Sequence, residues 1–144
     1  MSSGWQATCV AIGGRGVLIE GAAGTGKSSL ALALIDRGAV LVGDDSVRLA
    51  PHRGGVSASP HPATRGLLEV RGVGLVELPV AEGIPVCLVI TLDPAAPRFV
   101  EIADTTERAD VALPHLLLFP DSPVLALRAE LALSRHGLPL PDGH

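Results

Sequence analysis

The chain has 144 residues, of which 47% are hydrophobic, and this length is enough for one domain, residues 1–144, with a substantial core. Its net charge of −4 and its 2% aromatic residues argue against nucleic acid as a partner. No apolar run approaches the roughly 18 residues of a membrane span, and the N-terminus lacks the features of a secretion signal, so we expect no membrane contact and a cytoplasmic location.

The first predicted elements are two strands and a helix. Residues 7–12 and 17–20 have the composition of strands, and the glycine pair at 13 and 14 predicts a hairpin turn between them. Residues 27–37 then have the pattern of a helix that ends before Gly38. The isolated Cys9 and Cys87 lack the spacing of metal ligands, so we expect buried, reduced thiols.

The pattern G-x-x-x-x-G-K-[ST], typical of a P-loop, lies between the second strand and the helix. Its glycines let backbone N–H groups face one concavity, where phosphate oxygens bind. Lys27, the only lysine of the chain, could reach nucleotide phosphates, and the hydroxyl of Ser28 could bind Mg²⁺. An ordinary glycine-rich turn is the alternative. The predicted nucleotide-binding residues are Gly21, Ala22, Ala23, Gly24, Thr25, Gly26, Lys27, Ser28 and Ser29.

An acidic pair, Asp44 and Asp45, follows a short predicted strand at residues 40–42. If the strand–helix–strand unit is a right-handed crossover, the two strands are parallel and end at the same edge of the sheet. The pair would then lie beside the phosphates, where aspartates can hold Mg²⁺ or accept a proton from an attacking hydroxyl. An acidic surface turn is the alternative.

Residues 46–49 predict a further strand, and residues 51–62, rich in proline and glycine, predict a loop. Such a loop could cover a substrate or simply connect two elements. Residues 67–78 predict a strand, a turn and a strand, with Glu69 and Arg71 on the same side. These two side chains could act as metal ligand and phosphate clamp, or they could form a surface ion pair.

The remaining residues predict one buried strand and one helix as their main elements. Residues 85–92 are almost continuously apolar and predict a central strand buried on both faces. The smaller predictions are an edge strand at 98–102, a polar connection at 104–110, a short apolar segment at 116–119, a helix at 123–136 capped by Ser122 and ended at Gly137, and a frayed tail at 138–144.

The run GAAGTGKSSLALALIDRGAVLVGDD followed by LLEVRGVGLVEL resembles HPr kinase/phosphorylase, specifically the catalytic domain in the short form of α-proteobacteria. The phosphate loop, the aspartate pair and the L-E-[IV]-R-G-[LV]-G signature occur in the family's order, and the resemblance covers residues 7 to about 92. It implies an α/β fold: a single P-loop domain with a mixed β-sheet, related to phosphoenolpyruvate carboxykinase.

The resemblance also implies an activity, with its cofactors and partners. Members of the family use ATP and Mg²⁺ to phosphorylate a serine of HPr, the phosphocarrier of the phosphotransferase system, and can reverse this by phosphorolysis. The long forms are hexamers, so a homo-oligomer is compatible with the resemblance. Carried over by position, Lys27, Asp44 and Asp45 are the catalytic residues, with Asp45 as general base. Ser28, Asp44 and Glu69 are the implied metal ligands.

One position departs from the family pattern. Short members carry histidine in a pattern like H-A-[ST]-x-V-A, whereas this chain has Gln6 at that position. Glutamine cannot become a cation near neutral pH. A nucleotide-binding sensor module with weak or no phosphoryl transfer is therefore the alternative function. A small-molecule kinase is a third hypothesis, and the LEVRGVG signature argues against it.

Overall fold

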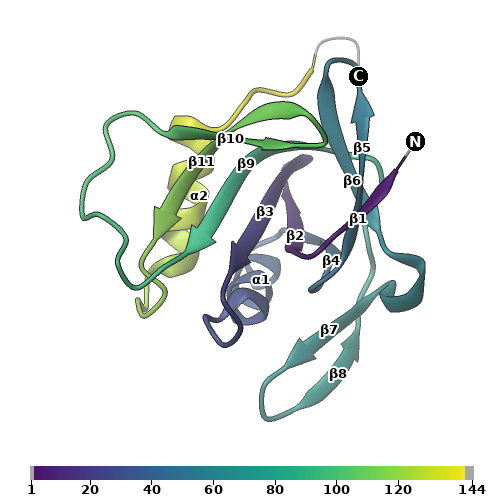
Figure 1. Ribbon diagram of the computed structural model, residues 1–144. Coiled ribbons are helices and arrows are strands. Elements are labelled where there is room, and N and C mark those ends of the chain that lie inside the picture. The colour runs from purple at the N-terminus through teal and green to yellow at the C-terminus, as the bar shows by residue number, and fades with distance from the viewer. Residues whose placement is uncertain (1, 142–144) are drawn as a thin grey trace.

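A curled, mixed β-sheet with two α-helices against one face makes up residues 2–141, the part of the chain that this computed structural model describes (Figure 1). The helices are α1 (Lys27–Asp36) and α2 (Leu125–His136), and a short 3₁₀ turn spans Pro62–Thr64. The strands are β1 (Ser3–Trp5), β2 (Thr8–Ile12), β3 (Arg15–Gly21), β4 (Val40–Gly43), β5 (Val47–His52), β6 (Gly55–Pro60), β7 (Leu67–Val70), β8 (Gly74–Glu77), β9 (Ile84–Leu92), β10 (Asp104–Arg108) and β11 (Val111–Leu118).

The main sheet has the strand order β1-β5-β6-β9-β3-β2-β4, with β11 also beside β9 and β10 beside β11. Strand β9 is parallel to both β3 and β11, and the other pairs are antiparallel. Strands β7 and β8 form a separate hairpin. The predicted central strand at 85–92 is confirmed, because β9 lies between β3 and β11 and is buried from Val86 to Ile90.

The predicted common edge for the two strands around α1 is also confirmed. Strands β3 and β4 both run antiparallel to β2, which lies between them, so they point in the same direction without being neighbours. The loop after β3 and the acidic pair after β4 therefore leave the sheet at the same edge.

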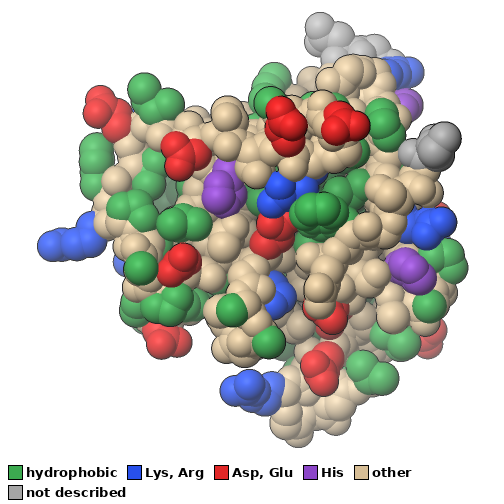
Figure 2. Space-filling view, viewed as in Figure 1, with side chains coloured by type: hydrophobic (Ala, Val, Ile, Leu, Met, Phe, Trp, Pro, Cys, Tyr) green, Lys and Arg blue, Asp and Glu red, His purple; other side chains and the backbone are tan. Residues whose placement is uncertain are grey.

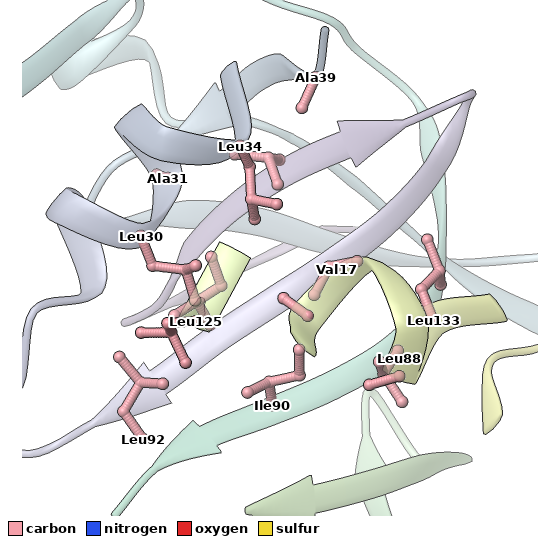
Figure 3. Packing of buried hydrophobic residues seen from close by; sticks show 14 of the residues in the cluster. Val17, Leu30, Ala31, Leu34, Ala39, Leu88, Ile90, Leu92, Leu125 and Leu133 are labelled. Carbon is pink, nitrogen blue, oxygen red and sulfur yellow. The ribbon is translucent and has the colours of Figure 1, made fainter. Parts of the chain in front are cut away.

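The core is divided by the sheet. On the helix side, Val17 and Ile19 of β3 pack with Leu34 of α1 and with residues of α2 (Figure 3). Leu18, between them in sequence, points to the opposite side and joins a second cluster inside the curl with Leu113. This alternation is the expected pattern of a strand buried on both faces, and it anchors β3 firmly beneath the loop that follows it.

The prediction of a loop at residues 51–62 is wrong. Strand β5 continues to His52 and β6 occupies residues 55–60, with a turn at Arg53 and Gly54 between them. Proline is tolerated here because of its position: Pro51 lies beyond the residues of β5 that pair with β1, and Pro60 is the last residue of β6. The segment is thus part of the sheet and not a substrate-covering loop.

Two predictions for the C-terminal third are also wrong. Residues 98–102 form no strand, and residues 104–108, predicted as a polar connection, form β10, which pairs only with β11. An edge strand accommodates charged residues because one face and one edge meet solvent.

The sequence also predicts the start of α2 and a frayed C-terminal tail. Helix α2 starts at Leu125, after a turn in which the hydroxyl of Ser122 accepts a hydrogen bond from the N–H of Val124. The last three residues of the predicted frayed tail lie outside the described part. Within residues 2–141 no helix is long and apolar enough to cross a membrane.

Candidate functional site

A cleft of about 1210 Å³ opens beside the loop that joins β3 to α1. Its walls come from distant parts of the chain: this loop, the aspartate pair after β4, the β7–β8 hairpin and the segment leading into α2. Of the predicted nucleotide-binding residues, all line the cleft except Ala22. The structure therefore brings together the three predicted motifs. It adds residues before and at the start of α2 that the sequence did not connect with a site: Pro120, Asp121, Ser122, Pro123, Leu125 and Ala126.

The loop conformation depends on glycine. Gly21, Gly24 and Gly26 have φ angles of 144°, 81° and 98°, which residues with a side chain rarely adopt. A Cβ atom on Gly21 would also lie 2.9 Å from the carbonyl oxygen of Leu92. Helix α1 then begins with neither a capping side chain nor an acidic residue in its first turn. Its N–H groups and its positive dipole end are therefore available to an anion.

The charge of Lys27 is held directly at this loop. Its half-buried Nζ donates hydrogen bonds to the carbonyl oxygens of Gly21, at 2.9 Å, and Ala22, at 3.1 Å. The charge of the chain's only lysine thus adds to the positive dipole end of α1. The arrangement suits the recognition of phosphate.

Asp44 is the centre of the hydrogen-bond network in the cleft. Its carboxylate, only 9% exposed, accepts hydrogen bonds at Oδ1 from the hydroxyls of Ser28, at 2.7 Å, and Thr8, at 3.0 Å. Its Oδ2 accepts a third from the backbone N–H of Glu69 at 3.0 Å. This one side chain ties α1, β2 and β7 together, so it fixes the relative positions of the loop, the acidic pair and the hairpin.

Asp45 has a different environment from its neighbour. It is exposed, it lines the cleft, and its backbone adopts a left-handed conformation with φ of 63°. Its N–H donates to the hydroxyl of Thr8 at 3.2 Å, which holds the backbone in place. The pair is thus divided into a buried carboxylate that accepts three hydrogen bonds and an accessible one.

The two signature residues Glu69 and Arg71 both line the cleft and are exposed. Glu69 is on β7, whereas Arg71 is in the turn that follows, and the ion pairs of the described residues do not join the two. Their side chains are therefore accessible to a ligand in the cleft.

The predicted metal ligands are compatible with Mg²⁺ by their chemistry. Ser28, Asp44 and Glu69 offer hydroxyl and carboxylate oxygens, the donors that this hard cation prefers. Within residues 2–141 no group of three or more His, Cys, Asp or Glu side chains could hold a metal ion. A Mg²⁺ ion would then rely on one or two carboxylates together with substrate phosphates and water, which is its usual mode of binding.

Gln6 and Thr8, which precede the loop in the sequence, complete the site. Gln6 lines the cleft, so the position that departs from the family pattern belongs to the same site as the predicted nucleotide-binding residues. Thr8, which the sequence analysis did not single out, is completely buried and bonds to both aspartates. Its signal was present in the sequence, because Thr8 is the one hydroxyl in the apolar strand ATCVAI.

Comparisons with known proteins show which family the chain is similar to. Residues 2–88 match the family model described as HPr Serine kinase C-terminal domain. The HPr kinase/phosphorylase of Clostridium tetani is 45% identical over 71 residues, which are 49% of this chain and 23% of that protein. The HPr kinase/phosphorylase of Bordetella petrii is 50% identical over 68 residues, which are 45% of this chain and 21% of that protein. The chain thus spans less than a quarter of the length of these two relatives.

A solved structure resembles the chain over most of its length. It is the Hpr(Ser) kinase/phosphatase from Coxiella burnetii, with a TM-score of 0.81 and 29% sequence identity, covering 92% of this chain and 94% of that one. The mixed α/β fold with its curled sheet is therefore that of this kinase/phosphatase, including the C-terminal third that the sequence motifs did not reach.

Proposed function

Because the chain belongs to the HPr serine kinase C-terminal domain family, we propose that it is an ATP-dependent kinase for a serine of an HPr-type phosphocarrier protein, with phosphorolysis as the reverse reaction. The observation that carries the proposal is the 2.7 Å hydrogen bond from Ser28 to Asp44, which joins the phosphate-binding loop to the acidic pair. The cytoplasmic location and the homo-oligomer stay predictions.

In this proposal the triphosphate of ATP lies on the loop between β3 and α1. The N–H groups at the start of α1 and the ammonium of Lys27 bind its oxygens. Ser28, Asp44 and Glu69 would hold Mg²⁺, which neutralises charge on the phosphates when it is bound. Positioning and charge neutralisation then provide most of the acceleration.

Asp45 is the residue proposed to accept the proton of the substrate serine. The serine oxygen forms a bond to the γ-phosphorus, the bond from that phosphorus to the β–γ bridging oxygen breaks, and ADP leaves. The proton of the hydroxyl passes to the accessible carboxylate of Asp45. Asp44 is less suited to this role, because it is buried and three donors already occupy its oxygens.

Transfer of the γ-phosphoryl group tests the proposal. Incubation with ATP labelled in that group, Mg²⁺ and purified HPr should place label on an HPr serine. We expect Lys27→Ala to abolish transfer and Asp45→Asn to lower it by about 10²–10⁴-fold. Asp110→Asn is a matched control, because Asp110 also has a φ of 63° but lies in the turn between β10 and β11, away from the cleft. Label on neither HPr nor a small molecule would contradict kinase activity.

The alternative function is a nucleotide sensor with little phosphoryl transfer. The observation that favours it is Gln6, an uncharged side chain in the cleft at the position where the family pattern has histidine. Binding of ATP and Mg²⁺ without label on HPr would support the sensor. Label on small metabolites alone would instead support a small-molecule kinase.

A further inference from the structure

Outside the cleft, a cluster of Trp5, Glu20 and Arg108 joins β1, β3 and β10, three strands that are not neighbours in the sheet. Arg108 donates to Oε1 of Glu20 through Nη2 at 2.6 Å and to Oε2 through Nε at 3.0 Å. Trp5 donates to Oε2 through Nε1 at 2.8 Å. On the face shown in Figure 2, charged side chains of both signs meet near the middle, in the region where Figure 1 shows β3.

Several contacts at once hold the side chains of the cluster in place. The side chains of Arg108 and Glu20 are only 14% and 15% exposed, and a paired guanidinium and carboxylate in such a place form a strong, directional contact. Arg108 also donates to the hydroxyl of Thr106, and its guanidinium lies 4.7 Å from the ring centroid of Trp5. Both oxygens of Glu20 accept hydrogen bonds within the cluster, so the position of this carboxylate is fixed from two sides.

The position of the cluster next to the cleft gives it a different role. Glu20 is the residue before Gly21, whose carbonyl oxygen accepts the hydrogen bond from Nζ of Lys27 at 2.9 Å. Trp5 is the residue before Gln6, which lines the cleft. Neither Trp5 nor Glu20 itself lines the cleft. The cluster therefore fastens the backbone immediately ahead of two parts of the cleft wall.

The curl of the sheet is what makes this contact possible. Along the strand order, β5, β6 and β9 separate β1 from β3, yet the Trp5 indole reaches the carboxylate of Glu20. On its other side, Trp5 of β1 pairs with Val47 of β5, two residues after Asp45. A hydrogen bond from Trp5 thus connects the strand that carries the loop with the part of the sheet next to the acidic pair.

We propose that Glu20, held by Arg108 and Trp5, is a positioning residue for the nucleotide. It fixes the end of β3, and through the carbonyl of Gly21 it fixes the ammonium of Lys27 relative to the phosphates. The inference rests on the proposed function, since ATP with Mg²⁺ is the ligand, but its readout is nucleotide affinity and not transfer to HPr.

The test compares two similar ion pairs. Glu20→Gln keeps the size of the side chain and removes its charge, and we expect the dissociation constant of MgATP, measured by calorimetry, to rise about tenfold or more. The control is Glu130→Gln, because Glu130 also accepts hydrogen bonds from an arginine, Arg37, at 2.9 Å with both oxygens, but between α2 and α1 outside the cleft. This variant should leave the dissociation constant unchanged.

A purely structural role makes a different prediction. If Glu20→Gln lowered the free energy of unfolding but left MgATP affinity at the wild-type value, the positioning role would be overturned. Trp5→Phe and Arg108→Lys serve if Glu20→Gln does not fold. Trp5→Phe keeps a ring beside Arg108 while removing the indole donor. Both substitutes should raise the dissociation constant of MgATP above the wild-type value, and unchanged affinity in both would also overturn the inference.

The test of the positioning role and the test of the proposed kinase activity can fail independently. MgATP binding by the wild-type protein without label on HPr would contradict the kinase and leave the positioning role to be decided by the affinities of the variants. A wild-type protein that does not bind MgATP would overturn the positioning role.

Discussion

The hydroxyl of Thr8 donates a hydrogen bond to Oδ1 of Asp44 at 3.0 Å and accepts one from the N–H of Asp45 at 3.2 Å. One fully buried threonine thereby contacts both members of the acidic pair, across 36 residues of sequence in the case of Asp44. It orients one carboxylate toward Ser28 and holds the backbone of the other at the cleft. The different environments of the two aspartates depend on this contact.

Replacing Thr8 by valine should destabilise the protein although the shape of the side chain is preserved. Valine leaves the N–H of Asp45 without its partner and removes one donor to Asp44, so we expect a loss of about 2–3 kcal/mol in the free energy of unfolding. Urea unfolding measures this loss. Thr8→Ser keeps the hydroxyl and should remain much closer to wild type; equal losses in the two variants would show that the methyl group, not the hydrogen bonds, is what matters.

The two aspartates should respond differently to the same substitution. Asp44→Asn replaces an acceptor of three hydrogen bonds in a buried position and should cost about 1–3 kcal/mol in the free energy of unfolding. Asp45→Asn is exposed at a positive φ angle that asparagine tolerates, so its effect should stay within about 0.5 kcal/mol. Chemical unfolding of both variants checks this, and a larger loss for Asp45→Asn would contradict the division between them.

Gln6→His should increase phosphoryl transfer to HPr. The side chain at position 6 lines the cleft, and a histidine there carries a positive charge below its ordinary pKa of about 6.5. The gain over wild type should therefore be larger at pH 6 than at pH 8, because a cation beside the phosphates favours transfer. Initial rates of HPr labelling across this pH range measure it, and identical rates at all pH values would remove Gln6 as a reason for weak activity.

Stability should fall at alkaline pH through Cys9. Burial raises the pKa of this thiol from 9.0 to about 12. In the unfolded chain the thiol loses its proton near pH 9, whereas in the folded protein it keeps it until about pH 12, so the unfolded state binds fewer protons and is favoured as pH rises through this window. The slope is at most about 1.4 kcal/mol per pH unit for this thiol.

Unfolding by urea at pH 8 and pH 10 tests the effect of Cys9. Burial also raises the pKa of the Cys87 thiol, so both thiols act in the same direction. Cys9→Ala should be less stable overall but should lose less stability than wild type between the two pH values. An unchanged difference between pH 8 and pH 10 in this variant would show that Cys9 is not the group that titrates.

The loop and the acidic pair could be predicted from the sequence because both depend on local rules. Gly21, Gly24 and Gly26 stand where the backbone needs positive φ angles, and the helix starts at Lys27, as expected. The common edge for β3 and β4 follows from the parallel direction expected for a strand–helix–strand unit, and this direction is observed here even with β2 between the strands.

The errors lie where pairing between distant strands overrides composition. Proline and glycine at 51–62 are typical of a loop, but β5 and β6 pair with each other and extend the sheet. The charged residues at 104–108 are typical of a connection, but pairing with β11 makes them an edge strand. In both cases backbone hydrogen bonds to a neighbouring strand decide the structure. The residues of the segment itself do not indicate which strand that neighbour is.

The sequence alone determined the glycine loop between β3 and α1, the acidic pair and the hairpin of β7 and β8, because turns, helix starts and strand alternation are set by neighbouring residues. Only the tertiary structure decided which aspartate is buried, that Thr8 contacts both, and that Glu20 meets Arg108 across 88 residues. The Thr8 contacts come from the pairing of β2 with β4, and the contact of Glu20 with Arg108 comes from the curl of the sheet; both depend on strands that the local sequence does not specify.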